Sequence, residues 1–198
     1  SRTVTVQQLY DIVDSHPEVF TDMSPTTTLD STVKVDTTTY GYTSVKGVSE
    51  TYLDMMGRTL AQGRGLTYVD ITDNKKVCVV GDYIARAAYG GNAIGQTIKI
   101  GSERFTIVGV LEANVSSTTD QEGTDDDMIF VPYTTAQRIS KTSASSYGVV
   151  LVSDELADEG KNLLVAGIES ILHAEDGYFI TSLSEMLETM TSMINDVS

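Results

Sequence analysis

The side chains that most often carry out chemistry are few in this sequence and widely separated. The two histidines are His16, which precedes Pro17 at the end of a predicted helix, and His173, near the end of another. Neither has a second histidine at metal-ligand spacing, so we expect no zinc site. The single cysteine, Cys78, lies in an apolar run. It is expected to be a buried hydrophobic residue rather than a nucleophile.

Motifs for nucleophilic catalysis and for phosphate binding are also missing. The sequence contains no Gly-x-Ser-x-Gly elbow. Its glycine-containing segments, Gly63-Arg64-Gly65 and Gly90-Gly91, are not followed by the Gly-Lys-Ser/Thr of a phosphate-binding loop. We therefore predict a protein that is not an enzyme, with no catalytic residue, no cofactor site and no resident metal.

A polar segment from Glu112 to Asp127 contains most of the closely spaced carboxylates. It shows no periodicity and predicts a long surface loop. Its oxygens are of the kind that Ca²⁺ prefers, although their spacing differs from that of an EF-hand loop. The favoured interpretation is a solvated loop, and calcium binding stays an alternative. The carboxylates concerned are Asp120, Glu122, Asp125, Asp126 and Asp127.

Length and charge limit the classes of function. A chain of 198 residues with 40% hydrophobic residues can bury a sizeable core, as one large domain or two small ones. A net charge of -15 disfavours binding to nucleic acid or to an anionic membrane surface, and it suits a cationic partner or simple solubility. Because the chain begins at Ser1 and contains no apolar run of about eighteen residues, we expect a fragment of a longer protein.

Hydrophobic periodicity and turn signals predict an α+β chain without a regular βαβ alternation. Gly101-Ser102 is the predicted turn of a β-hairpin, and Gly90-Gly91 is predicted to close the helix over residues 82–88. Thr5 and Gln8 form a capping-box pattern at the start of the first helix. The predicted helices cover residues 6–15, 50–56, 82–88, 134–140, 156–173 and 182–198, and the predicted strands cover 32–36, 39–43, 77–80, 97–100, 105–110, 128–131, 147–152 and 178–181.

The last predicted helix has an apolar seam and no stop signal. Ser182 and Glu185 form a second capping-box pattern, and apolar residues follow with three-four spacing as far as Val197. Such a helix either continues toward another segment or packs on its own domain.

An ordered series of short motifs in the middle of the chain resembles a known family. The series resembles the MacB-like periplasmic core domain of ABC-transporter permeases of the MacB, LolC/LolE and FtsX type, over about Val45 to Thr135. Its members, in order, are Val45-x-Gly47-Val48-Ser49-x-x-Tyr52-Leu53, Leu60-x-x-Gly63-Arg64, Asp70, Val77-x-Val79-Val80-Gly81, Ala85, Tyr89-Gly90, Ile94-Gly95-x-x-Ile98-x-Ile100, Phe105-Thr106-Ile107-Val108-Gly109-Val110 and Asp127-x-Ile129-x-Val131-Pro132.

Individual residues of this series have expected structural roles. Gly63 and Gly95 suit backbone positions with positive φ. Gly109, inside a predicted strand, indicates a bulge or a close backbone approach. We also predict that Arg64 pairs with Asp70 and fixes the connection between them. None of these residues is expected to contact a substrate.

The resemblance implies an insert between two transmembrane helices of a permease, on the extracytoplasmic side of the bacterial cell membrane. It implies two lobes: a porter-like α+β lobe from residues 1–45 and 130–198, and a mostly β, sabre-like lobe from residues 46–129. The implied partners are a cognate ABC ATPase subunit or domain, acting through the membrane helices, and a second permease copy. An extracytoplasmic adaptor, or a peptide or lipid substrate, is a further possible partner.

The chain also departs from the pattern of the family. Many relatives carry Leu-Phe-Gly where this chain has Ala88-Tyr89-Gly90, and the segment from Glu112 to Asp127 is its own. Partner and substrate contacts therefore stay unassigned.

The leading functional prediction is a non-catalytic domain that relays ATP-driven movement or binds an extracytoplasmic partner. A stand-alone extracellular module that binds a cationic peptide is the first alternative, since the net charge favours it. An enzyme with scattered catalytic residues is the second.

Overall fold

The computed structural model describes residues 4–115 and 121–172, which belong to two compact units. Unit 1 contains Ser1–Pro25, Met55–Gly57 and Ala144–Ser198, and unit 2 contains Thr26–Asp54 and Arg58–Ser143. Each unit has its own cluster of buried hydrophobic side chains. The assignment of residues 1–45 and 130–198 to a porter-like lobe, and of residues 46–129 to a sabre-like lobe, stays a prediction.

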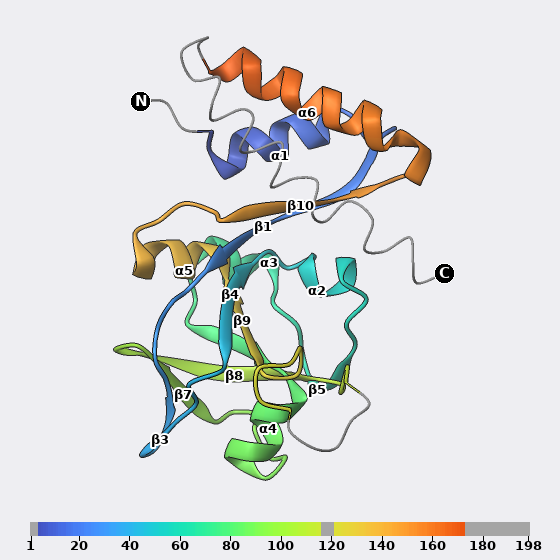
Figure 1. Ribbon diagram of the computed structural model, residues 1–198. Helices are drawn as coiled ribbons and strands as arrows, with labels where there is room; N and C mark the ends of the chain where they lie inside the picture. The colour runs from blue at the N-terminus through green and yellow to red at the C-terminus, as the bar shows by residue number, and fades with distance from the viewer. Residues whose placement is uncertain (1–3, 116–120, 173–198) are drawn as a thin grey trace. The chain divides into compact units, whose positions relative to one another are not determined.

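The described residues of unit 1 form two α-helices and two strands (Figure 1). Helix α1 (Val6–Asp14) begins with the predicted capping box, in which the Thr5 hydroxyl accepts a hydrogen bond from the Gln8 amide. It packs against α6 (Ala157–Ile171), where a Cβ atom at Gly167 would approach Ile12 to 2.6 Å. Strand β10 (Ser146–Leu151) is the neighbour of β1 (Phe20–Thr28), and the short 3₁₀ turn η1 (Asp154–Leu156) leads into α6.

Unit 2 contains a mixed sheet. The last residues of β1, Thr26–Thr28, pair antiparallel with β4, and the order then runs β4-β9-β6-β8-β7-β2-β3. The β4–β9 and β6–β8 pairs are parallel, whereas β6–β9, β7–β8, β2–β7, β2–β3 and β5–β8 are antiparallel. The strands are β2 Val33–Val35, β3 Thr38–Thr39, β4 Ser44–Val48, β5 Leu60–Gly63, β6 Val77–Val80, β7 Thr97–Ile100, β8 Glu103–Leu111 and β9 Met128–Pro132.

Four helices accompany the sheet of unit 2 in the described part of the chain. They are α2 (Tyr52–Met55), α3 (Tyr68–Thr72), α4 (Asp82–Tyr89) and α5 (Tyr133–Ser140). Helix α5 packs directly on β4, because a Cβ atom at Gly47 would approach the Cβ atom of Ala136 to 2.5 Å. Helix α4 ends at Gly90, which has a φ of 59° and closes the helix in the left-handed conformation.

Most of the predicted elements are present, with boundaries that agree to within two residues. The first helix, the buried strand β6, the β7–β8 hairpin and the helix closed by Gly90 are confirmed. The predicted strand at 178–181 and the predicted helix at 182–198 lie outside the described residues.

The predicted strand over residues 39–43 is wrong. Strand β3 ends at Thr39, and residues 40–43 form a turn in which the Thr43 amide donates to the Tyr40 carbonyl. The physical reason is the next contact along the chain. The Ser44 amide donates to the carbonyl of Asp127, just before β9, so the chain must leave the edge strand β3 before it can form β4, which pairs with β9.

The predicted glycine roles are confirmed. Gly63 and Gly95 have φ angles of 71° and 84°. The register between β6 and β8 shifts between Cys78 and Val79, which oppose Ile107 and Gly109, so the ladder is irregular beside Gly109. A Cβ atom at Gly109 would also lie 2.1 Å from the carbonyl oxygen of Arg64.

The chain is therefore of the α+β class, as predicted. Among the described residues, none of the helices has both the length and the apolar character needed to cross a membrane.

Candidate functional site

The predicted pair of Arg64 and Asp70 is present. Arg64 Nη1 lies 2.7 Å from Asp70 Oδ2, and the Asp70 side chain is 1% exposed. Asp70 also takes part in a capping box at α3: its carboxylate accepts the Thr67 amide at 2.8 Å, and its amide donates to the Thr67 hydroxyl. We call Arg64, Thr67 and Asp70 the Asp70 anchor. It fixes the connection between β5 and α3.

Burial and hydrogen bonding act in opposite directions on this carboxyl group. Burial raises the pKa of Asp70, but the hydrogen bonds from Arg64 and Thr67 outweigh it, so the pKa lies below its ordinary value. Asp70 is thus charged at neutral pH and serves as a hydrogen-bond acceptor.

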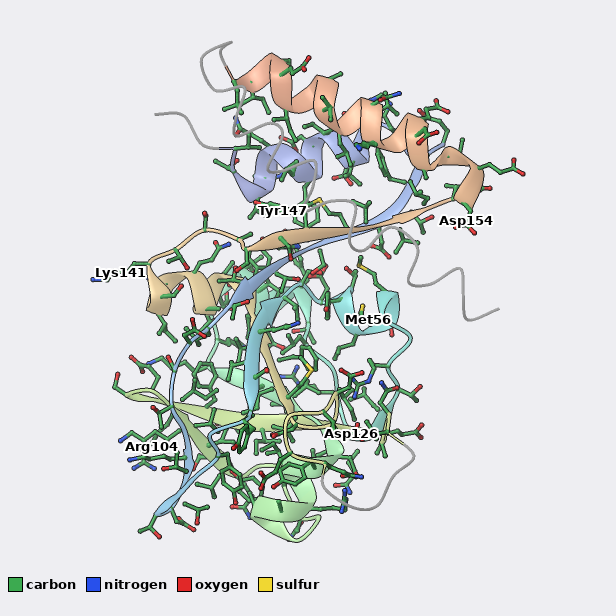
Figure 2. The ribbon with its side chains drawn as sticks, viewed as in Figure 1. Met56, Arg104, Asp126, Lys141, Tyr147 and Asp154 are labelled. Carbon is green, nitrogen blue, oxygen red and sulfur yellow. The ribbon has the colours of Figure 1, made fainter. Side chains whose placement is uncertain are left out.

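A second buried aspartate lies in the acidic segment. Asp126 is completely buried, its two carboxylate oxygens accept the amides of Asn114 and Val115 at 2.7 and 2.9 Å, and Arg58 Nη2 lies 3.5 Å away (Figure 2). We call Arg58, Asn114, Val115 and Asp126 the Asp126 anchor. The expectation of a fully solvated segment is therefore wrong at this residue, because these donors replace the water that a charged carboxylate needs.

The adjacent Asp127 is held in a similar way. It is 2% exposed, and its carboxylate accepts the Thr43 hydroxyl at 2.6 Å and the Gly123 amide at 2.8 Å. Of the predicted calcium set, Glu122 and Asp125 are exposed and Asp120 lies outside the described residues. Within residues 4–115 and 121–172, no group of three or more histidine, cysteine or acidic side chains is arranged to hold a metal ion. The buried carboxylates of this segment instead bind the protein itself.

The other residues considered for chemistry have separate surroundings where the structure describes them. His16, in unit 1, lies 3.2 Å from the carboxylate of Glu18. Cys78 is completely buried in the core of unit 2, and burial raises the pKa of its thiol far above the ordinary value. His173 lies outside the described residues. A buried, protonated thiol is a poor nucleophile.

A pocket of about 380 Å³ opens in unit 2 beside the turn that follows β3. The turn supplies Tyr40 and Tyr42, α4 supplies Tyr83, and the acidic segment supplies Glu122 and Asp127. We call this the tyrosine pocket. A second pocket of about 490 Å³, lined by residues 28–33 and 39–46, shares residues 39–42 with it.

The chemistry of the tyrosine pocket is that of a binding site for a polar or cationic group. The Tyr83 hydroxyl donates to Glu122 Oε1 at 3.3 Å, and burial together with the charge of Glu122 raises the pKa of Tyr83. The phenol therefore stays protonated near neutral pH and cannot act as a base. Tyr42 is 70% exposed, so its ring is available to a ligand. Aromatic faces next to carboxylates attract cations, and the described lining includes no histidine, cysteine or lysine.

Sequence reasoning did not find this pocket. It assigned Tyr40 and Tyr42 to a strand, where alternate side chains share one face of a sheet. Gly41 between the two tyrosines was the available signal, since glycine is common in turns. The contributions of Tyr83 and Glu122 come from segments about forty and eighty residues further along the chain, and spacing gave no indication of them.

Comparison with protein families gives a match that covers most of the chain. Residues 1–166 match the MacB-like periplasmic core domain. The chain is 29% identical over 150 residues to "Macrolide export ATP-binding/permease protein MacB 1/2" of Paracoccus denitrificans (strain Pd 1222), covering 75% of this chain and 22% of that protein. It is 29% identical over 162 residues to the MacB protein of Chlorobium luteolum (strain DSM 273 / BCRC 81028 / 2530), covering 79% and 24%. The chain thus spans about a quarter of the length of these relatives.

Solved structures show the same fold. The periplasmic region of MacB from Actinobacillus actinomycetemcomitans superposes with a TM-score of 0.68 at 21% identity, covering 86% of this chain and 75% of that one. The extracellular domain of the noncanonic ABC-type transporter YknZ from Gram-positive bacteria gives a TM-score of 0.66 at 15% identity, covering 82% and 81%. Because the family match extends over residues 1–166 and the fold agrees, the chain belongs to the family of MacB-like periplasmic core domains.

Proposed function

We propose that this chain is the extracytoplasmic domain of an ABC-transporter permease in a bacterial cell membrane. The observation that carries the proposal is the family match over residues 1–166. Relatives that share this region are named ATP-binding/permease proteins, and the chain corresponds to about a quarter of their length. The remaining three quarters of such a protein have room for membrane helices and an ATP-binding domain.

Within that protein the domain relays movement and performs no reaction of its own. ATP hydrolysis in a separate domain, or in a partner subunit, drives the membrane helices, and these displace the domain. This role is supported by the partners of two buried carboxylates: those of Asp70 and Asp126 bind arginines and backbone amides of unit 2. The same proposal gives a second permease copy and an extracytoplasmic adaptor as candidate partners. An extracytoplasmic substrate is the candidate cargo.

The test has a genetic and a biochemical part. The complete reading frame should contain apolar spans of about twenty residues on both sides of the domain. The isolated domain should show no ATPase or hydrolase turnover. In the full-length protein, replacing the domain by a flexible linker should abolish ATP-coupled transport while ATP binding persists. A soluble full-length protein, or turnover by the isolated domain, would contradict the proposal.

A second candidate function is the binding of a cationic peptide, and the tyrosine pocket favours it. The pocket combines the ring of Tyr42 with the carboxylate of Glu122 in a chain whose net charge is -15. A lysine- or arginine-containing peptide should bind the isolated domain and dissociate as salt is raised. Tyr42→Ala should weaken binding about fivefold, which corresponds to the loss of one cation–π contact.

The matched control for this experiment is Tyr68→Ala. Tyr68 is 68% exposed, close to the 70% of Tyr42, and does not line the described pocket. Equal weakening by the two variants would show that the peptide binds through general surface contacts and would exclude the pocket as its site.

A further inference from the structure

Three cationic side chains stand in direct cross-strand register on one face of the unit 2 sheet. Lys34 of β2 lies opposite Lys99 of β7, and Lys99 lies opposite Arg104 of β8. All three are exposed, and each is next to at least one buried residue of its own strand: Val33 beside Lys34, Ile98 and Ile100 beside Lys99, and Phe105 beside Arg104. Directly opposite residues in antiparallel strands project from the same face. We call Lys34, Lys99 and Arg104 the cationic ladder; Arg104 lies at the surface in Figure 2.

The ladder has no acidic partner in the described part of the chain. No ion pair within 4.0 Å is formed by any of its three members, although Arg58, Arg64, Lys76 and Arg86 elsewhere in unit 2 each have one. Asp36, in the turn between β2 and β3, likewise forms no such pair with any residue that the structure describes. This arrangement is unexpected in a sequence with 28 acidic and 13 basic residues. Like charges directly opposite each other also destabilise a sheet.

The remaining side chains in register with the ladder are small and polar. Thr39 of β3 lies opposite Lys34, and the next pair along β7 and β8 is Thr97 opposite Thr106. These threonines are exposed and their hydroxyl groups can donate hydrogen bonds to carboxylate oxygens. The face is therefore a grid of cations and hydroxyl groups, and it includes no acidic side chain at these register positions.

We propose that the cationic ladder is a docking surface for an acidic segment of a partner protein. Neighbouring strands are about 4.8 Å apart, so the three charges span about 10 Å. This spacing matches a row of separate carboxylates, such as acidic residues three or four positions apart on a helix, whose Cβ atoms lie about 5–6 Å apart. The partner supplies the negative charges that the described part of this chain does not place there. The inference does not depend on the chain being part of a transporter.

An extended polyanion is a less suitable occupant. With a net charge of -15, the rest of the chain repels a membrane surface or a nucleic acid that meets more than the ladder. A short acidic segment contacts only the cationic ladder and the threonines in register with it. A single small anion is also a poorer match, because the three charged groups arise from three different strands.

The test uses the isolated domain at low salt and a helical, alanine-based peptide that carries three glutamates at four-residue intervals. Wild-type domain should bind the peptide, and raising the salt from about 50 to 300 mM should release it. Lys99→Glu should weaken binding at least tenfold, because it places a negative charge between the other two cations. Lys75→Glu is the matched control: Lys75 is exposed, lies outside the ladder and produces the same change in net charge. It should weaken binding less than twofold.

A second measurement separates docking from a structural role. Because Lys99 is flanked by two like charges, Lys99→Glu should raise the melting temperature of the domain by about 1–3 °C while it removes binding. A lowered melting temperature would overturn the proposal, since it would reveal a stabilising partner for Lys99 within the chain. Equal loss of binding in Lys75→Glu and Lys99→Glu, or no binding of the peptide at low salt, would overturn it as well.

Two further outcomes would assign the ladder to another partner. Lys99-dependent binding to vesicles of anionic phospholipid, without binding of the peptide, would identify a membrane surface. Salt-sensitive self-association that disappears in Lys99→Glu would identify a second copy of this chain. Either result overturns the assignment to an acidic partner protein.

Discussion

The Asp70 and Asp126 anchors both stabilise a buried carboxylate, but their partners lie at very different distances along the sequence. Each holds a buried aspartate with one arginine and with backbone amides, one for Asp70 and two for Asp126. Asp70 finds its partners within six residues, in Arg64 and Thr67. Asp126 finds its arginine, Arg58, 68 residues earlier in the chain.

Solvent exposure separates the two anchors further. The Arg64 side chain is 46% exposed, whereas that of Arg58 is 9% exposed. A charge that reaches water can be solvated when its partner is removed, and a buried charge cannot. The Asp126 anchor should therefore contribute more to stability, although the sequence makes the Asp70 anchor far easier to predict.

The variant expected to lower stability most is Asp126→Ala, and it tests the ranking of the two anchors. It leaves Arg58 without its carboxylate in a buried position and removes the acceptor of two backbone amides. We expect the free energy of unfolding to fall by about 3–5 kcal/mol, as when a buried ion pair loses one partner. Urea denaturation monitored by circular dichroism measures the change.

The neighbouring Asp125→Ala is the control for that variant, since Asp125 is exposed. Its effect should stay within about 1 kcal/mol. The double variant Arg58→Met/Asp126→Ala should recover part of the loss, because no buried charge remains without a partner. If Asp126→Ala were no more harmful than Asp125→Ala, the ranking of the two anchors would be wrong.

A glycine lies against each anchor and gives a second test. A Cβ atom at Gly81 would lie 2.3 Å from the carbonyl oxygen of Asp126, and one at Gly109 would lie 2.1 Å from that of Arg64. Gly81→Ala and Gly109→Ala should each lower stability by about 3 kcal/mol, at the upper end of the range for overpacking, because backbone must move. Gly41→Ala, where no atom lies within 4 Å, should change stability by less than about 0.5 kcal/mol.

These glycine variants also compare the two segments directly. A larger effect at Gly81 would mean that the acidic segment is held more rigidly than the connection between β5 and α3. A negligible effect at either site would show that the nearby carbonyl moves away at little cost, and that its anchor is not rigid there.

Local signals account for the parts of the fold that the sequence could predict. The Thr5–Gln8 capping box, the Gly101-Ser102 turn and the Gly90 helix end each depend on residues a few positions apart, and all three are present. Strand β1 was not predicted, because Pro25 within it argues against a strand from the sequence alone. Strand β4 contains Gly47, which is weak as a strand former but permits the close approach of α5.

In the candidate site, too, the sequence predicted the contacts between nearby residues and missed those between distant ones. The pairing of Arg64 with Asp70 followed from proximity and opposite charge, and it is confirmed. The burial of Asp126 could not be predicted, because an aspartate in an acidic, polar segment is ordinarily solvated. Only the folded chain brings Arg58 and the two amides to it. The tyrosine pocket and the cationic ladder are likewise products of strand pairing and turn geometry.

Arg64→Ala is a milder test, directed at the local anchor. The Asp70 carboxylate loses its arginine but keeps the Thr67 amide, and the Arg64 site is partly exposed. We expect a loss of about 1–2 kcal/mol at pH 7. The pKa of Asp70 is lowered in the folded state, so its contribution is present above the ordinary value of 3.8 and is lost as the pH falls through the folded pKa.

The pH dependence gives the readout that packing alone would not change. In Arg64→Ala the pKa of Asp70 should be less depressed, so the stability difference from the wild type should narrow between pH 7 and pH 3. Urea midpoints at both pH values measure this. A difference that stayed constant over that interval would mean that Arg64 contributes through packing rather than through the charge of Asp70.

The smallest expected effect belongs to Thr67→Ala, which removes one hydroxyl group from the Asp70 anchor. The Thr67 hydroxyl accepts the Asp70 amide at 3.2 Å, at the start of the five-residue helix α3. Loss of this cap should lower the free energy of unfolding by about 0.5–1 kcal/mol, and Thr67→Ser should restore it because the hydroxyl group remains. The carboxylate keeps both Arg64 and the Thr67 amide in either variant. If Thr67→Ala were as harmful as Asp126→Ala, the local contacts would be as important to stability as the long-range ones, and exposure of the arginine would not explain the difference between the two anchors.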